Sequence, residues 1–117
     1  MDALRNLAVW RRACRFSVDV YRLLANCRNL GYRDQLGRSA LSVASNIAEG
    51  SERGTDKEFT RFLKIAKGSA GEAWTQLLIG TEAGFIDKTK GLQQADEAQQ
   101  ISKMLYGLIK HLEEKSQ

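Results

Sequence analysis

The sequence predicts an all-α protein, an up-down-up-down antiparallel four-helix bundle, on three observations. The 117 residues contain no proline, the residue that most strongly interrupts helices. Helix-favouring residues such as Ala, Leu, Glu, Lys, Arg and Gln are abundant. Apolar side chains recur every three or four residues in four long segments, which is the spacing of helices that bury one side. Short connections favour antiparallel neighbours, and the length suits one domain over residues 1–117.

The first two helices are expected at about residues 4–27 and 34–51. Asn and Gly residues between them suit a helix end followed by a turn. Gly50 and Gly54 favour the end of the second helix. The positions expected to face the core are Trp10, Ala13, Ser17, Val20, Leu24, Cys27, Leu36, Ala40, Val43 and Ile47.

The last two helices are expected at about residues 56–83 and 88–114. The boundary signals are Thr55 with Glu58, Gly84 and Asp87. The first pair forms a capping box, the glycine stops a helix, and the aspartate caps the next one. The positions expected to face the core are Phe59, Phe62, Ala66, Ala70, Ala73, Leu77, Leu92, Ala95, Ala98, Ile101, Leu105, Leu108 and Leu112.

The two cysteines, Cys14 and Cys27, fall on the same expected helix. A rise of about 1.5 Å per residue places their Cα atoms roughly 20 Å apart, well beyond the limit of about 7 Å for a disulfide. We therefore expect two thiols on the apolar side of the helix, rather than redox or metal-binding groups.

A polar stripe flanks the apolar seam of the second helix and has a counterpart on the third. Its members are Gln35, Ser39, Ser42, Asn46, Glu49 and Arg53, then Ser69, Glu72 and Gln76. Folding these helices antiparallel sets residue i opposite roughly 110 − i, which brings Arg38 near Glu72. Half-buried polar groups must be paired, so we expect a hydrogen-bonded network along a helix or subunit seam, with Arg38–Glu72 as its ion pair. The alternative is a polar shoulder in solvent.

The first helix carries a second apolar stripe, away from its core side. Its members, four, three and four residues apart, are Cys14, Val18, Tyr21 and Ala25. A helix that is apolar on two sides is normally covered on both, and a monomeric bundle covers only one. The stripe therefore predicts self-association.

Basic residues form two outward stripes that could bind phosphates. Their members are Arg11, Arg12, Arg15 and Arg22 on the first helix and Lys57, Arg61 and Lys64 on the third. Residues 1–68 carry thirteen basic and seven acidic side chains, within a net charge of +4. Arginine donates to phosphate through a planar fork, and such contacts bind nucleic acid without sequence preference. The alternative is an ordinary solvated surface, since Asp19 and Glu58 accompany the stripes.

Catalytic chemistry finds little support in the sequence. His111 is the only histidine, and Leu108 stands three residues before it, so no Glu-x-x-His di-iron motif exists. No glycine-rich phosphate loop with its lysine is present. We expect a protein that is not an enzyme and that has no cofactor and no metal site.

One long segment matches a known family. The matching residues are Arg38, Ser39, Ala40, Ser42, Asn46-Ile-Ala-Glu-Gly50, Arg53, Phe59, Phe62, Leu63, Ile65, Ala66, Gly68, Ser69 and Glu72. This stretch, residues 35–72, resembles the four-helix-bundle family encoded by intervening sequences within bacterial 23S ribosomal RNA genes. The resemblance implies a ring, a homopentamer. The sequence is also distantly similar to accessory proteins of diversity-generating retroelements, which are basic rings that bind reverse transcriptase and nucleic acid.

We therefore expect a homo-oligomeric bundle that binds structured RNA, with ribosomal RNA as the first candidate, through its outward arginines. The alternative is a protein-interaction adaptor ring without direct nucleic-acid binding. The N-terminal segment lacks the pattern of a signal peptide and the apolar runs are short, which predicts a cytoplasmic protein with no membrane partner.

Overall fold

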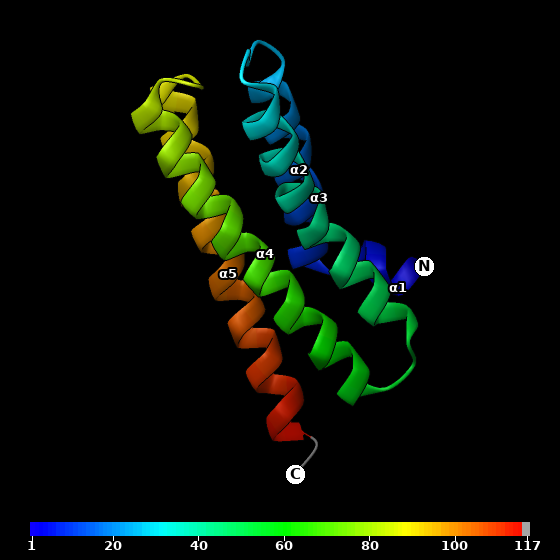
Figure 1. The fold of residues 1–117 in the computed structure, drawn as a ribbon. Helices are drawn as coiled ribbons and strands as arrows, with labels where there is room; N and C mark the ends of the chain where they lie inside the picture. The colour runs from blue at the N-terminus through cyan, green and yellow to red at the C-terminus, as the bar shows by residue number, and fades with distance from the viewer. Residues whose placement is uncertain (116–117) are drawn as a thin grey trace.

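The computed structural model describes residues 1–115, and the regular structure in that range is helical (Figure 1). The helices are α1 (Asp2–Arg5), α2 (Ala8–Leu24), α3 (Leu30–Glu52), α4 (Asp56–Ala83) and α5 (Lys88–Lys115). Each long helix contacts the next along the chain, and α2 also contacts α5. The four long helices thus close into the antiparallel up-down-up-down bundle that the sequence predicts, with α1 against α2.

The core runs along the bundle axis and uses most of the predicted stripes. The fully buried positions of α3 are Leu36, Ala40, Val43 and Ile47. One core prediction is wrong, because Leu92 is 44% exposed. A step of three or four residues back from the buried Ala95 leads to residue 92 or 91, so either could face the core. In the structure Gly91 faces the core. A side chain at position 91 would collide with the hydroxyl of Thr81, so the glycine lets α5 approach α4 closely.

The first predicted helix, 4–27, is divided and shorter than expected. The chain leaves helical geometry at Leu7, whose ψ is 111°, and this break turns Leu4 into the core, where it is buried. Helix α2 then ends at Leu24. Cys27 consequently lies beyond the helix, and both cysteines are free thiols.

Helix α3 begins at Leu30, one turn before the predicted start at residue 34. The cause is Asn29, whose side-chain oxygen accepts a hydrogen bond of 3.0 Å from the backbone amide of Tyr32. This side chain satisfies an amide that the first helical turn leaves without a partner. The asparagine that we expected to end one helix therefore starts the next.

The other predicted boundaries are confirmed. The Thr55 hydroxyl accepts from the amide of Glu58 at 3.2 Å, and Asp87 accepts from the amide of Lys90 at 2.9 Å. Gly84 ends α4 with a φ of 77°, a left-handed conformation that glycine adopts without a steric cost.

Two connections lie together at one end of the bundle, whose extents are 47 × 23 × 21 Å (Figure 1). Residues 25–29 join α2 to α3, and residues 84–87 join α4 to α5. We call these two connections, with the helical turns that adjoin them, the loop end. None of the helices within residues 1–115 has both the length and the apolarity needed to cross a bilayer.

Candidate nucleic-acid interface

The arginine stripe of α2 is exposed, but its members differ in what they contact. Arg15 donates to one carboxylate oxygen of Asp19, from Nε at 3.1 Å and from Nη2 at 2.7 Å. This hydrogen bond raises the pKa of Arg15 above its ordinary value. Arg11 donates to the backbone carbonyl of Arg5 at 2.8 Å, which leaves most of its guanidinium free for an anion. Arg22 has no ion-pair partner within residues 1–115.

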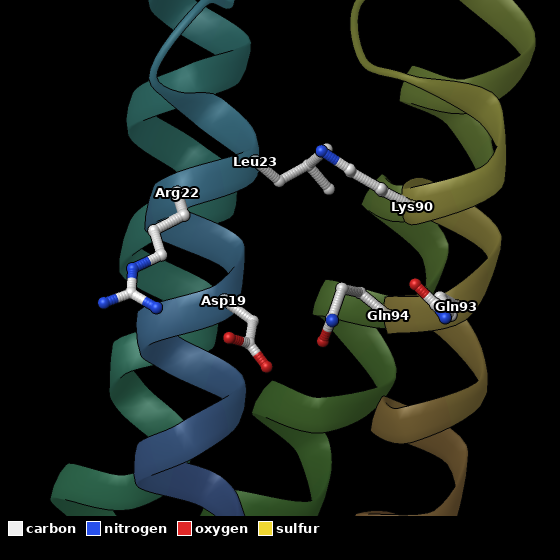
Figure 2. Close-up of a pocket in the computed structure, with 6 residues that line it drawn as sticks. All are labelled: Asp19, Arg22, Leu23, Lys90, Gln93 and Gln94. Atoms are coloured by element: carbon white, nitrogen blue, oxygen red, sulfur yellow. The ribbon is translucent and has the colours of Figure 1, made fainter.

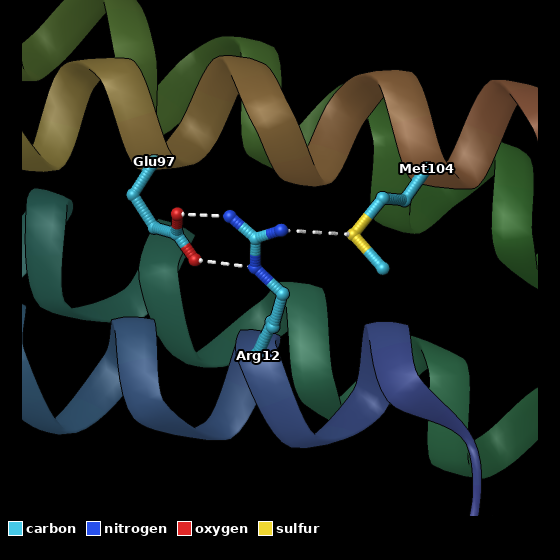
Figure 3. A network of polar contacts seen from close by, with 3 residues as sticks. All are labelled: Arg12, Glu97 and Met104. Atoms are coloured by element: carbon cyan, nitrogen blue, oxygen red, sulfur yellow. Dashed lines mark hydrogen bonds and ion pairs between the residues drawn. The ribbon is translucent and has the colours of Figure 1, made fainter.

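Arg12 points toward α5 rather than into solvent (Figure 3). Its Nε donates to Glu97 at 3.0 Å, its Nη2 donates to the second oxygen of the same carboxylate, and its Nη1 lies 3.6 Å from the sulfur of Met104. The hydrogen bond to Glu97 is the main cause of a raised pKa for Arg12. A bidentate pair of this kind fixes geometry, so Arg12 joins α2 to α5 and is poorly placed to bind phosphate.

The second basic stripe, on α4, is also partly paired. Arg61 contacts Glu58 at 3.3 Å and lies over the ring of Phe62. Lys64 reaches Glu113 of α5 at 3.0 Å. Lys57 is exposed and has no carboxylate partner among the described residues. A phosphate would therefore have to displace a carboxylate at much of this stripe.

Ten exposed lysines and arginines have no ion-pair partner within residues 1–115. Five are spread along the bundle (Arg5, Arg11, Lys57, Lys103 and Lys110), and the other five lie together at the loop end. They are Arg22, Arg28, Arg33, Lys88 and Lys90. They come from α2, the connection that follows it, α3 and α5. Because no single helix carries them, helical periodicity could not reveal them. The antiparallel order could have done so, since it places residues 25–29 beside residues 84–87.

Three acidic residues of the same region are committed to other contacts, whereas Glu82, in the last turn of α4, is exposed and has no ion-pair partner among residues 1–115. Asp19 is held by Arg15, and Asp34 by Arg38 at 3.1 Å. Asp87 caps α5 through its side chain. Among the described residues, five cations of the loop end thus lie outside ion pairs, against two carboxylates, Asp87 and Glu82, that also lie outside ion pairs.

A polar cleft opens at this end between α2 and α5 (Figure 2). One part, of about 320 Å³, is lined by Asp19, Arg22, Leu23, Lys90, Gln93 and Gln94. An adjoining part, of about 360 Å³, shares Arg22, Leu23 and Lys90 and extends to Cys27 and to residues 84–87.

The polar stripe of α3 is paired in its middle. Ser42 and Ser69 share a hydrogen bond of 2.8 Å between α3 and α4, and the Asn46 amide donates to the carbonyl and the hydroxyl of Ser42. Ser39 is buried. On the α2 side, the Ser17 hydroxyl donates to the carbonyl of Ala40 at 2.9 Å. These contacts tie α3 to both of its neighbours.

The charged members of the stripe lie in solvent, and the expected Arg38–Glu72 ion pair is wrong. Arg38 pairs with Asp34 on its own helix at 3.1 Å, and Glu72 is exposed. Glu49 and Arg53 likewise form a largely exposed pair at 3.6 Å. The hydroxyls of Ser42 and Ser69 allow α3 and α4 to lie close together. The longer side chains of Arg38 and Glu72 therefore point away from the contact, into solvent.

Two apolar surfaces lie on opposite sides of the bundle. The α2/α3 surface includes the predicted stripe: Val18 and Tyr21 are 41% and 48% exposed, Cys14 is half-buried and Ala25 is exposed. Leu41 of α3 extends this surface. The α4/α5 surface comprises Trp74, Leu78, Ile79, Leu92 and Tyr106. The α2/α3 pair is opposite the α4/α5 pair in the closed bundle, so the two surfaces face away from each other.

Comparison with known proteins agrees with the resemblance seen in the sequence. A protein of unknown function from the S23 ribosomal protein family of Bacteroides thetaiotaomicron has a similar fold, with a TM-score of 0.77 and 24% sequence identity. That similarity covers 87% of this chain and 98% of the other, and at this identity it shows the fold alone. No curated protein matches the sequence. The family model described as 23S rRNA-intervening sequence protein matches residues 5–107. Because this match spans most of the chain, the protein belongs to the 23S rRNA-intervening sequence protein family.

Proposed function

We propose that this protein is a non-enzymatic, homo-oligomeric bundle that binds structured RNA, with ribosomal RNA as the first candidate. The observation that carries the proposal is the group of unpaired cations at the loop end. Phosphate contacts from such residues supply affinity that does not depend on sequence. The protein works in the cytoplasm, without a cofactor and without a membrane partner.

The outward stripes add to this surface. Arg11 and Lys57 are free of carboxylates among the described residues, whereas Arg15, Arg61 and Lys64 form exposed ion pairs. Exposed pairs contribute only about 0–1 kcal/mol, so RNA phosphates can replace the carboxylates at small cost. RNA thus spreads from the loop end along α2 and α4, while Arg12 keeps its place between the helices.

Assembly follows from the two apolar surfaces. When unlike surfaces on opposite sides of a subunit meet head to tail, the subunits form a ring if the rotation closes. In the proposed ring, the α2/α3 surface of one copy packs on the α4/α5 surface of the next, and the family resemblance implies five copies. A ring repeats the loop end around its axis, and this repetition strengthens weak RNA contacts through multivalency.

RNA binding is tested by filter retention of a 23S ribosomal RNA fragment between 50 and 200 mM salt. Retention is expected to fall steeply with salt, and the Arg22→Glu, Arg28→Glu, Lys88→Glu triple variant is expected to lose it. Arg38→Glu, at an exposed and paired arginine of α3, is the matched control. If the amount of RNA retained changed neither with salt concentration nor in the triple variant, the proposed phosphate contacts would be wrong.

Assembly is tested by sedimentation of two variants, Tyr21→Lys and Trp74→Lys. Each damages one of the two apolar surfaces, so each alone should sediment as a monomer. A mixture retains one intact pair of surfaces and should form a dimer that does not grow further. A ring that survives both changes would rule out this head-to-tail contact.

The alternative function is an adaptor ring that displays a site for another protein. The exposed Trp74 and Ile79 favour it, because apolar side chains of this size commonly mark protein interfaces. The salt series separates the two functions. An adaptor would show no salt-sensitive RNA retention, and its apolar α4/α5 surface would stay accessible in the assembled ring.

A further inference from the structure

The cleft between α2 and α5 lies on the loop-end side of the side chains that join these two helices. The Arg12–Glu97 pair, with Met104 beside it, ties α2 to α5 away from the loop end (Figure 3). Toward the loop end the facing residues are mostly polar, and Figure 2 shows a space between Leu23 on one side and Gln94 on the other. The two parts of about 320 and 360 Å³ fall in the size range of small-molecule pockets.

The upper part of this cleft favours an anion. Lys90 extends across the opening toward Leu23 (Figure 2), and it has no carboxylate partner among residues 1–115. Arg22 lines the same opening. Its guanidinium points away in Figure 2. The side chain is exposed and has no ion-pair partner within residues 1–115, so an anion at Lys90 would have to draw it in through a change of rotamer. Asp87, the carboxylate on this rim, is engaged in capping α5.

The interior offers different groups. Gln94 points from α5 toward Asp19 of α2 (Figure 2), and its side-chain oxygen is buried without a hydrogen-bond partner within the described part of the chain. A buried acceptor of this kind costs free energy until it meets a donor. Asp19 uses one oxygen to hold Arg15. The Gln94 oxygen has almost no accessible surface, so a ligand reaches it only when the Gln94 side chain turns toward the cleft. The second oxygen of Asp19 is the acceptor that already lines the cleft, and the two groups together favour a ligand that carries hydroxyl donors.

The second part of the cleft adds an aromatic ring. Phe85 lines it and packs against Tyr32, with ring centroids 5.1 Å apart, so the ring is held in place. Leu23 and Ile86 provide further apolar lining. A flat, sequence-tolerant surface next to cations is how proteins bind the bases of single-stranded nucleic acid.

We propose that this cleft binds one ribonucleoside monophosphate unit. Its phosphate lies at Lys90 and Arg22, its ribose hydroxyls donate to Gln94 and Asp19, and its base packs against Phe85. The unit is either a free mononucleotide or the phosphorylated end of an RNA strand, and the chemistry of recognition is the same. Only the second case rests on the proposed RNA binding.

The test is calorimetric titration of the full chain with adenosine 5′-monophosphate, 2′-deoxyadenosine 5′-monophosphate, adenosine and inorganic phosphate. The ribonucleotide should bind most tightly, because it alone combines the phosphate and the base with both ribose hydroxyls. Lys90→Gln should weaken it by about tenfold or more, the value of a charge-assisted hydrogen bond. Gln94→Met should weaken binding of the ribonucleotide and abolish its higher affinity over the deoxynucleotide.

Lys103→Gln is the control, because it removes an exposed charge from the same helix outside the cleft. It should change the affinity by less than about twofold.

Circular dichroism should show that each variant is folded. Both variants are expected to fold, because Lys90 is exposed and Gln94→Met removes an acceptor that has no hydrogen-bond partner among the described residues. The site would be rejected if the folded chain did not bind the ribonucleotide. It would also be rejected if neither Lys90→Gln nor Gln94→Met changed the affinity, even if RNA bound elsewhere on the protein. Competition then identifies the source. Displacement of a 5′-phosphorylated RNA oligonucleotide by the mononucleotide supports a strand end, and binding of both together supports a free nucleotide.

Discussion

The α3–α4 side and the α2–α5 side of the bundle are built in opposite ways. Between α3 and α4, small residues allow close approach: Ser42 bonds directly to Ser69, and the Tyr32 hydroxyl donates to the backbone carbonyl of Gln76 at 2.6 Å. Between α2 and α5, a pair of long side chains, Arg12 and Glu97, spans a wider separation. The closely packed side fixes the register of the helices, and the wider side leaves room for a cleft.

The largest expected effect tests the closeness of α3 and α4. A Cβ at position 80 would collide with the hydroxyl of Tyr32, so Gly80→Ala must displace a half-buried ring and break its hydrogen bond. We expect a loss of about 2–3 kcal/mol in the free energy of unfolding, measured by urea denaturation. Gly68→Ala is the matched control on α4. Its Cβ would meet nothing within 4 Å, so it should gain up to about 1 kcal/mol from helix propensity. Equal effects of the two changes would contradict the close approach.

The second expected effect concerns the hydroxyl pair. Ser42→Ala and Ser69→Ala should each cost about 1 kcal/mol, because each removes the hydrogen bond that joins α3 to α4. The double variant should cost less than the sum, with a coupling of about 0.5–1 kcal/mol. Thermal or urea unfolding of the four proteins gives this value. Strict additivity would mean that the hydrogen bond contributes nothing.

The α2–α5 side should be less sensitive. Arg12 and Glu97 have exposed side-chain fractions of 44% and 27%, so their interaction is screened by solvent. We expect Arg12→Met to cost about 0.5–1 kcal/mol and the cost to shrink at high salt. Arg11→Met, beside it on α2, should cost less. If Arg12→Met lowered the free energy of unfolding by more than about 3 kcal/mol, the α2–α5 contact would contribute more to stability than the α3–α4 contact.

A pH dependence at the α3–α4 side is a further prediction. Burial raises the pKa of Tyr32 to about 12 from an ordinary 10.0. The neutral phenol is therefore favoured in the folded state. Its contribution to stability is fully present below pH 10 and is lost as pH rises from about 10 to about 12. Absorbance at alkaline pH should show a late ionisation that Tyr32→Phe removes. An ionisation of Tyr32 near pH 10 in the folded protein would contradict its burial.

The sequence predicted the fold closely because periodicity and capping act locally. Thr55, Gly84 and Asp87 end and start helices through contacts with residues only a few positions away. Asn29 was misread because an asparagine suits both the end of one helix and the start of the next. The structure shows the second use, because the Asn29 side chain accepts from the amide of Tyr32.

The candidate site was less predictable for the opposite reason. The partners of Arg12 and Lys64 lie on α5, far along the chain, and helical periodicity carries no information about them. Similarly, Arg28 and Lys88 form a surface only when two separate connections meet at the loop end. A stripe on one helix can be read from spacing, whereas a cluster built from several elements needs the packed bundle.

The most direct test of the account compares the salt dependence of RNA affinity at these two kinds of basic residue. Arg28→Gln with Lys88→Gln removes unpaired cations, and Arg12→Gln with Arg38→Gln removes cations that are held by carboxylates and lie outside the proposed RNA surface. The slope of log affinity against log salt concentration should fall by about two for the first double variant and stay near the parent value for the second. A slope that falls for the paired residues and stays unchanged for the loop end would contradict the account.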